Sequence, residues 1–365
     1  MRLPLMDRDN AADIDIEQTK KMVDVFMEKG FTYFDTAWMY HAFNSENAIK
    51  AAVVDRYPRE SFTVASKLHA GFFDKPEGRD EIFNKQLEKT GAGYFDYYLL
   101  HGITDTSIGK YEALDCFSWI QEKKAAGLVK HIGFSFHGTP ELLDELLTKY
   151  PFFEFVQIQL NYLDWNSQGI RSKDCYDAAV KHNVPVIVME PVKGGTLANV
   201  PDSVTELFKT YDPEASIASW AIRFAASLDN VMCVLSGMSS IEQMDDNLSY
   251  MDNFKPLNAE ELKLVEKAAE LINENIKIPC TGCSYCTEGC PMNIPIPKYF
   301  SLYNADFQEV EGKEWLPQES YYENLTKTHG KGSDCIACGQ CESVCPQHLN
   351  IIELMAEVAK HFEEG

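Results

Sequence analysis

The sequence has little positive charge. Its 365 residues include 33 Lys and Arg against 56 Asp and Glu, which gives a formal net charge of −23. This balance argues against nucleic acid or an anionic membrane surface as a partner, and it leaves a basic protein partner open. No apolar run is long enough to cross a bilayer, and the chain turns acidic after residues 1–5 without the apolar stretch of a signal peptide. We therefore expect a soluble protein of the cytoplasm.

The sequence also lacks a G-x-G-x-x-G turn after an early strand, which an open, doubly wound dinucleotide-binding sheet should carry. Instead, short β-prone runs alternate with helical segments over roughly 250 residues, a pattern that predicts an α/β fold of the (β/α)8 TIM barrel type. We count seven such runs, and residues 1–5 would have to supply the first of eight strands. The runs are 31–35, 62–66, 95–100, 129–136, 153–160, 184–189 and 231–235.

The first three of these runs lead into titratable residues. Asp35 closes the first run, Lys67 directly follows the second, and His101 directly follows the third. Tyr40 lies five residues after Asp35. The carboxyl ends of barrel strands meet at one mouth, where TIM-barrel active sites are built. One polar residue after a strand is usually an ordinary surface group, but three successive strand ends of this kind favour a catalytic site.

Asp, Tyr, Lys and His in this order and context resemble the catalytic tetrad of the aldo/keto reductases. The resemblance covers residues 1–255, and it places Asp35, Tyr40, Lys67 and His101 on the four tetrad positions. It implies a barrel enzyme that interconverts carbonyls and alcohols of small molecules with NAD(P)H, with Tyr40 as the general acid. The family normally has a longer N-terminal segment than this chain, with a glycine-rich strand that contacts the cofactor.

The chemistry needs these residue types together. A tyrosine has an unperturbed pKa of about 10 and is a poor acid at neutral pH unless a nearby ammonium lowers that pKa. A buried lysine, in turn, needs a carboxylate to stay charged. We therefore expect Asp35 to hold Lys67, Lys67 to lower the pKa of Tyr40, and His101 to orient or polarise the carbonyl.

Later strand ends match positions at which the same family contacts its cofactor. The resemblance implies that Ser135 and Gln157 hold the nicotinamide carboxamide, and that Met189 stacks on the ring where many members have an aromatic residue. Gly237 and Gln243 stand where many members place a cation against the 2′-phosphate, which weakens the case for NADPH over NADH. The remaining expected contacts are Lys193 at the pyrophosphate, and Ser236, Met238 and Asn247 in the adenine and phosphate loop before a helix.

The C-terminal part contains two cysteine runs with identical spacing, C-x-x-C-x-x-C-x-x-x-C-P. This is the bacterial-type [4Fe–4S] pattern, in which the fourth cysteine of each run ligates the cluster of the other run. A zinc ribbon is the alternative, but ribbons use separated cysteine pairs. One cluster would take Cys280, Cys283, Cys286 and Cys345, and the other would take Cys335, Cys338, Cys341 and Cys290.

This part resembles two-cluster ferredoxins over residues 278–365, apart from a long insert at 298–334 that could dock the module or cover a cluster. The prediction is therefore a barrel domain over 1–277 and a small α+β ferredoxin-type domain over 278–365. Three further cysteines stand alone. The clustering of the other eight indicates metal rather than disulfides, and hence a reducing compartment.

Two functions follow from these motifs. The first is an oxidoreductase of aldo/keto reductase type with two [4Fe–4S] clusters. The second is an iron–sulfur electron-transfer protein, in which the clusters exchange electrons with a protein partner and the barrel docks that partner or holds a flavin. The intact tetrad favours the first. The substrate is not set by these residues, because the loops of this fold vary freely.

Overall fold

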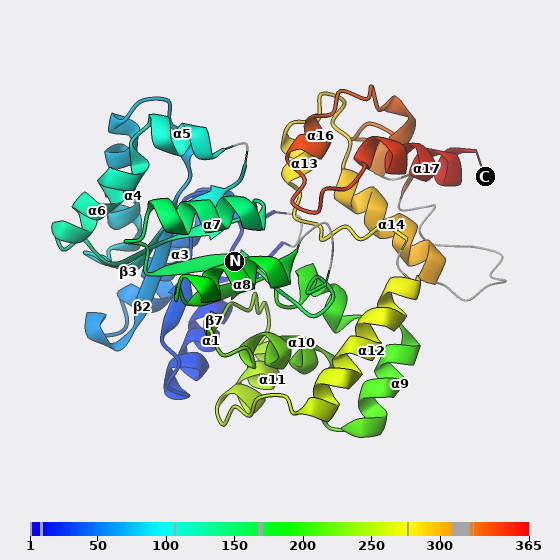
Figure 1. The fold of residues 1–365 in the computed structure, drawn as a ribbon, viewed down its shortest axis with the longest axis horizontal. Helices are drawn as coiled ribbons and strands as arrows, with labels where there is room; N and C mark the ends of the chain where they lie inside the picture. Colours follow the sequence, from blue (N-terminus) through cyan, green and yellow to red (C-terminus); the bar gives the residue numbers. More distant parts are fainter. Residues whose placement is uncertain are drawn as a thin grey trace. The chain divides into compact units, whose positions relative to one another are not determined.

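Seven parallel strands form one sheet whose order follows the sequence, from β1 to β7. The structure is a computed structural model, and it describes residues 2–7, 10–105, 107–166, 171–275, 277–308, 322–323 and 325–364. The strands are β1 Tyr33–Asp35, β2 Thr63–Leu68, β3 Phe95–Ile103, β4 Val129–Phe136, β5 Phe155–Gln159, β6 Val186–Met189 and β7 Val231–Val234. All seven coincide with predicted runs, and the predicted α/β fold of parallel strands and outer helices is confirmed (Figure 1).

The chain divides into two compact units that each use several segments of the sequence. The first contains all seven strands and comprises 1–160, 172–191 and 222–257, and the second comprises 161–171, 192–221 and 258–365. In the first unit the helices are α1 Ile16–Glu28, α2 Tyr40–Phe43, α3 Ser45–Ile49, α4 Glu77–Thr90, α5 Ile108–Ala113, α6 Cys116–Ala125, α7 Pro140–Lys149, α8 Ser172–Lys181 and α11 Ile241–Met251. The second has α9 Asp202–Tyr211, α12 Ala259–Asn275, α13 Tyr285–Glu288, α14 Ile296–Gln308, α16 Gln340–Ser343 and α17 Ile351–Glu363, while α10 Ile217–Ala226 belongs partly to each.

Local sequence signals mark the ends of several helices. The side chain of Asp15 accepts a hydrogen bond from the backbone N–H of Gln18 and caps α1. Thr139 caps α7 in the same way, and Pro140 occupies the first helical position. Gly91 ends α4 in the left-handed conformation, with a φ of 63°. These local signals fix the lengths of the connections between strands.

The described residues 2–5 do not supply a barrel strand, so the prediction of a first strand at the N-terminus is wrong. Leu5 instead forms an isolated antiparallel bridge with Ile14, and the part of the chain that the structure describes adds no eighth strand to the sheet. Pro4 is one physical reason, because proline has no N–H to donate to a sheet ladder.

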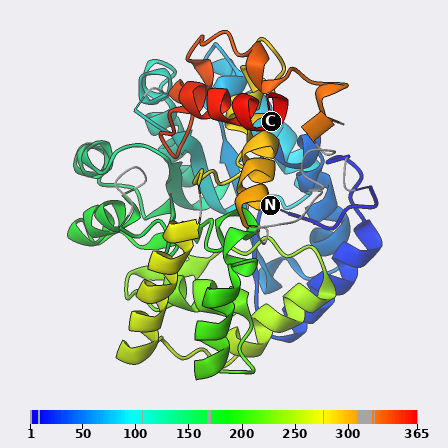
Figure 2. The ribbon, with the colours of Figure 1, turned by 90° about the vertical axis from the view of Figure 1, so that its right-hand side faces the viewer.

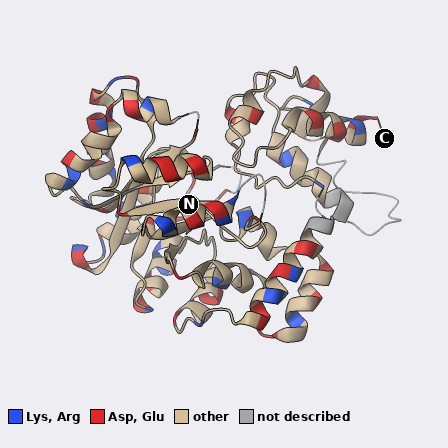
Figure 3. Cartoon of the chain, in the orientation of Figure 1, with Lys and Arg blue, Asp and Glu red and all other residues tan. Residues whose placement is uncertain are grey.

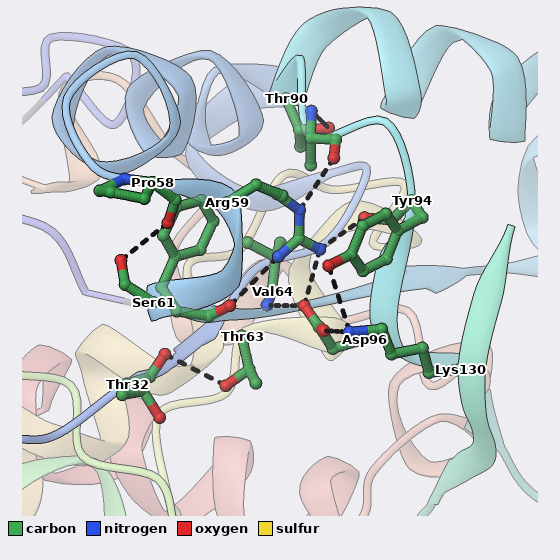
Figure 4. A network of polar contacts seen from close by, with 12 residues as sticks. Thr32, Pro58, Arg59, Ser61, Thr63, Val64, Thr90, Tyr94, Asp96 and Lys130 are labelled. Atoms are coloured by element: carbon green, nitrogen blue, oxygen red, sulfur yellow. Dashed lines mark hydrogen bonds and ion pairs between the residues drawn. The ribbon is translucent and has the colours of Figure 1, made fainter.

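The amino-terminal ends of β2 and β3 are held by a polar network around Arg59 (Figure 4). The guanidinium of Arg59 donates to Asp96 at 2.7 Å and to the carbonyl of Ala92 at 2.9 Å, and Asp96 also accepts from the backbone N–H of Val64 at 2.9 Å. Lys130 adds a second cation to Asp96 at 2.9 Å. This end of a parallel barrel serves stability, whereas catalysis lies at the opposite end.

The second unit has its own apolar core. The ring of Tyr322 lies 4.5 Å from that of Tyr299 and 4.8 Å from that of Phe362. Tyr299 belongs to α14 and Phe362 to α17, and these two helices lie side by side (Figures 1 and 2). The predicted insert at 298–334 contributes Tyr299 and Tyr322 to this core, while residues 309–321 and 324 lie outside the described part. Elsewhere in the unit α9 lies beside α12.

Acidic side chains occur on helices of both units, as the sequence predicts from its net charge of −23 (Figure 3). Among the described residues, a search for apolar helices long enough to cross a membrane finds none.

Candidate active site and cysteine cavities

The carboxyl ends of β1, β2 and β3 bring three of the predicted catalytic residues to one edge of the sheet. β2 pairs in parallel with β1 and with β3, and Lys67 is in register with Leu99, two residues before His101. Asp35 is the last residue of β1. The edge at which parallel strands end is where this fold builds active sites. Each of the three residues follows the apolar part of its strand, so the apolar runs indicate where in the sheet it lies.

Lys67 is fully buried and held by oxygens on both sides. Its ammonium donates to Asp35 Oδ2 at 2.6 Å and to the carbonyl oxygen of Thr36 at 2.8 Å. Burial lowers the pKa of Lys67, and the carboxylate of Asp35 acts in the opposite direction. The carboxylate of Asp35 thus offsets part of the cost of burying the ammonium.

Tyr40 lies between this ammonium and His101. The ring centroid of Tyr40 is 4.7 Å from Lys67 Nζ and 5.7 Å from the imidazole of His101, with the two rings nearly perpendicular. His101 Nδ1 is buried and has no hydrogen-bond partner within the described residues. Burial and the charge of Lys67 hold the pKa of His101 well below its usual value, so the imidazole is neutral at neutral pH.

The pKa of Tyr40 differs from expectation. Burial raises it well above the usual value, and the carboxylates of Asp35 and Glu190 raise it further. The ammonium of Lys67 lies 4.7 Å from the ring centroid, and the pKa of Tyr40 stays raised in its presence. The phenol is therefore protonated at neutral pH, but the raised pKa also makes it a weaker acid than an ordinary tyrosine. The expected lowering of this pKa by Lys67 is not found.

The backbone after Tyr40 is strained. His41, Ala42 and Phe43 have φ values of 53°, 49° and 68°, although none is glycine. The left-handed conformation costs roughly 1–2 kcal/mol for each such residue and is rarely adopted by consecutive ones. The turn is held by Asn44, whose side-chain amide donates to the carbonyl of Ala42 at 3.0 Å, and by Lys89 at 2.5 Å from the carbonyl of Phe43. Such strain clusters at functional sites.

The predicted carboxamide contacts lie on neighbouring strands. Ser135 on β4 is in register with Gln157 on β5. The Oγ of Ser135 accepts from the backbone N–H of Gly102 at 2.7 Å, and the amide nitrogen of Gln157 lies 3.3 Å from Met189 Sδ. Gln157 Oε1 is buried without a hydrogen-bond partner in the described chain. A nicotinamide carboxamide, which has an NH2 group to donate, fits this oxygen.

The predicted phosphate loop follows β7 and leads into α11. Asn247 donates to Ser236 Oγ at 2.9 Å, and Gln243 Oε1 accepts from the backbone N–H of Ser239 at 2.7 Å. Asn247 and Gln243 thus hold the loop in shape through hydrogen bonds with Ser236 and Ser239. Met238 packs against the core cluster that contains Met22, so its side chain serves the core.

Lys193 has a different environment from the one expected. It belongs to the second unit, is 2% exposed, and forms a buried ion pair with Asp164. Asp164 also accepts from Asn161 Nδ2 at 2.7 Å. The ion pair accounts for the buried charge of Lys193 without a pyrophosphate.

Two residues near these sites escape sequence reasoning. The aliphatic part of Arg2 lies against Gly237, where an added Cβ would stand 3.1 Å from Arg2 Cβ, and the carbonyl of Arg2 accepts from Ser239 Oγ at 3.0 Å. The N-terminal segment therefore places a cationic residue beside the predicted phosphate loop. Glu190, which raises the pKa of Tyr40, follows β6 with a φ of 58°. No local signal in the sequence marks either role.

The eight clustered cysteines line two separate cavities in the second unit, and each cavity combines three cysteines of one run with the fourth of the other. The first is lined by Cys280, Cys283, Cys286 and Cys345, and the second by Cys290, Cys335, Cys338 and Cys341. These are the two sets that the ferredoxin pattern predicts.

The spacing of the thiols within each cavity bears on the kind of metal. Among the described His, Cys, Asp and Glu residues, no three converge closely enough to bind one metal ion. A zinc site made of four cysteine thiolates needs all four sulfurs about 2.3 Å from a single ion. In a cluster, by contrast, each thiolate binds a different iron, and the crossed pairing of the two runs favours this arrangement. Burial raises the pKa of Cys280 to about 11, so metal binding must release protons from thiols.

Comparison with known families gives two matches along the chain. The aldo/keto reductase family matches residues 6–270, and a 4Fe-4S dicluster domain matches residues 279–350.

Solved structures share the fold of the first match. The aldo-keto reductase AKR11C1 from Bacillus halodurans is 24% identical with a TM-score of 0.58, and the match covers 73% of this chain and 91% of that one. An aldo-keto reductase from Klebsiella pneumoniae, solved in complex with NADPH, is 20% identical with a TM-score of 0.57, covering 69% and 84%. An aldo/keto reductase from Brucella melitensis is 18% identical with a TM-score of 0.54, covering 73% and 92%.

Proposed function

Because this chain belongs to the aldo/keto reductase family and is an oxidoreductase with a 4Fe-4S dicluster domain, we propose that it interconverts carbonyls and alcohols of small molecules with NAD(P)H. Tyr40 is the general acid in this proposal, and the module carries two [4Fe–4S] clusters. The domain boundary between 277 and 278 remains part of the proposal.

One observation carries the catalytic part. Lys67 is completely buried, is paired with Asp35 at 2.6 Å, and has its ammonium 4.7 Å from the ring centroid of Tyr40. An uncompensated charge in such a place would be strongly destabilising. A buried ion pair that faces a tyrosine at the catalytic end of a barrel is an arrangement suited to proton transfer.

The proposed reduction uses the groups as the structure presents them. Tyr40, which is protonated at neutral pH, gives its phenolic proton to the carbonyl oxygen of the substrate as negative charge develops on that oxygen. The phenolate that remains lies beside the ammonium of Lys67, which stabilises it. Neutral His101 offers its buried Nδ1 side to a polar partner and orients the carbonyl. NAD(P)H, when bound, supplies the hydride that the carbonyl carbon receives, so aldehyde or ketone becomes alcohol with one proton consumed.

The cofactor is proposed from the chain's own polar groups. The buried, unpartnered Gln157 Oε1 and the hydroxyl of Ser135 would hold the carboxamide. The loop of Ser236, at the amino end of α11, would receive phosphate through backbone N–H groups. The Klebsiella pneumoniae neighbour, described as a complex with NADPH, supports a nicotinamide dinucleotide as the cofactor.

The test compares two matched hydroxyl deletions. Tyr40→Phe should lower the rate of carbonyl reduction by about 10²–10⁴-fold, which is the usual contribution of general acid catalysis, while the Kd for NADPH stays within about threefold. Tyr33→Phe is the control, because the hydroxyl of Tyr33 is buried and has no hydrogen-bond partner among the described residues. A Tyr40→Phe enzyme within threefold of the parent rate would show that Tyr40 is not the acid.

The second candidate is an electron-transfer protein, and the two cysteine cavities favour it. It predicts that reduced clusters pass electrons to a protein acceptor. It also predicts that no aldehyde or ketone in a test panel causes NAD(P)H to be consumed. Absorbance at the nicotinamide band, read on enzyme purified without oxygen, distinguishes the two functions directly.

A further inference from the structure

The two cysteine runs are followed by different residues at equivalent positions. Each run ends in Cys-Pro, and the next residue is Met292 after the first run and Gln347 after the second. Because the fourth cysteine crosses over, Gln347 lines the cavity of Cys280 and Met292 lines the cavity of Cys335. At equivalent positions of the repeat, the metal site of Cys280 therefore has the polar Gln347 as a neighbour, and the metal site of Cys335 has the apolar Met292.

Gln347 is buried in an unusual state. Its side chain is 7% exposed, and both its amide nitrogen and its amide oxygen are buried without a hydrogen-bond partner in the described chain. Leaving a buried amide unpaired is costly, so the side chain needs a partner inside the cavity that it lines. The four thiolates around that cavity, with the cluster that they would hold, are acceptors for the two amide hydrogens.

The second cavity offers no such donor from its described side chains. Met292 stands in the place of Gln347, and Ile336 stands where the first cavity has Thr281. Its other lining residues are cysteine, proline, isoleucine and methionine. Hydrogen bonds to the sulfurs are one of the factors that set the reduction potential of an iron–sulfur cluster, because they stabilise the more negative reduced state.

We propose that Gln347 donates its side-chain amide to a sulfur of the cluster held by Cys280, Cys283, Cys286 and Cys345, and thereby raises the reduction potential of that cluster. The inference rests on the proposed presence of two [4Fe–4S] clusters. The redox step is the gain of one electron by this cluster from dithionite or from its neighbour, which is oxidised by one electron. Gln347 is thus a tuning residue rather than a ligand.

Solvent also acts on the two potentials. Cys338 in the second cavity is exposed, whereas the equivalent Cys283 in the first is half-buried. The absolute order of the potentials therefore mixes two effects. A test should compare each cluster with itself across variants.

The experiment is an anaerobic dithionite titration of the full-length protein, followed by electron paramagnetic resonance. The variants are Gln347→Met and Met292→Gln, with Met292→Leu as the control. Gln347→Met should make one cluster at least about tenfold harder to reduce at fixed potential, which equals about 59 mV for one electron. Met292→Gln should make the other cluster easier to reduce, and Met292→Leu should move neither midpoint.

The outcomes separate the tuning role from the cluster count. Iron and sulfide are measured on every sample, so a protein with fewer than two clusters fails at that step, overturning the proposed cluster content and this inference together. When both clusters are present, two results overturn the tuning role alone. The first is an unchanged midpoint potential in Gln347→Met, and the second is a shift of the same cluster in both Gln347→Met and Met292→Gln. Should Gln347→Met lose a cluster, the upward shift in Met292→Gln decides the matter, and its absence counts against the inference.

Discussion

Replacing Asp35 by Asn tests the central ion pair, because it removes a charge and leaves the shape of the side chain nearly unchanged. Lys67 Nζ lies 2.6 Å from Asp35 Oδ2, and the lysine side chain is 0% exposed against 13% for the aspartate. In the variant the ammonium keeps the carbonyl of Thr36 at 2.8 Å but loses its counter-charge.

The expected cost is large. Breaking a buried ion pair by removing one partner typically costs about 3–5 kcal/mol, since an uncompensated charge stays behind. This is a sizeable share of the roughly 5–15 kcal/mol by which domains are stable. Asp177→Asn is the control, because Lys173 and Asp177 form an exposed pair within one helix, where solvent screens the charges and only a small loss of stability is expected.

The dependence on pH has a definite sign. Burial already lowers the pKa of Lys67, and Asp35 opposes this, so Asp35→Asn lowers that pKa further. The depressed pKa means that the folded variant favours neutral lysine, and its stability falls as the pH falls through the folded pKa. Activity should move the other way, because lower pH restores the ammonium that stabilises the Tyr40 phenolate. At neutral pH we expect the rate to fall by about 10²–10⁴-fold.

Two measurements check this reasoning. Urea unfolding between about pH 6 and 9 gives the stability of parent, variant and control, and carbonyl reduction is assayed over the same range. The double variant Asp35→Asn with Lys67→Met should be more stable than Asp35→Asn alone, because no buried charge remains. The reasoning is refuted by a variant within about 1 kcal/mol of the parent at every pH, or by stability and activity that rise and fall together.

Two further outcomes concern the cofactors. Arg2→Gln should weaken the binding of NADPH by about 10- to 100-fold and that of NADH by less than threefold, since a charge-assisted contact to phosphate is worth about 1.5–3 kcal/mol. Equal weakening of the binding of both cofactors in fluorescence titrations would show that Arg2 does not face the 2′-phosphate. Protein purified without oxygen should contain about eight iron and eight sulfide per chain, as two [4Fe–4S] sites require; two zinc ions without sulfide would rule the clusters out.

The parts of the site that the sequence predicts are those set by strand order. Asp35, Lys67 and His101 lie together because parallel strands deliver their carboxyl ends to one edge, and apolar runs reveal where strands end. The division of cysteines between two cavities is equally predictable, since it follows from a repeated spacing.

Tertiary contacts set the remaining parts. Arg2 contacts Gly237 although most of the barrel sequence lies between the two residues, and no local pattern encodes such a contact. The left-handed turn after Tyr40 contains no glycine to announce it. The high pKa of Tyr40 follows from burial and from the carboxylates of Asp35 and Glu190, and the approach of Glu190 depends on the end of β6.

The sequence also gives a wrong prediction where the interaction partner of a residue cannot be recognised from it. Lys193 precedes two glycines, which suggests a phosphate turn, but its charge is neutralised by Asp164 inside the second unit. The difference between Gln347 and Met292 is visible once the two runs are aligned, although its meaning depends on the unpaired amide that the structure reveals.

The last prediction concerns electron transfer between the clusters and the nicotinamide. A nicotinamide exchanges a hydride, which carries two electrons together, whereas a [4Fe–4S] cluster exchanges one electron at a time. A flavin could convert between them, but the sequence shows no evident flavin-binding motif. Clusters reduced with dithionite, freed of excess reductant and mixed with NAD⁺ or NADP⁺, should therefore stay reduced over many turnover times. Reoxidation within one turnover, with formation of reduced nicotinamide and no flavin in the protein, would show that the clusters feed the barrel site directly.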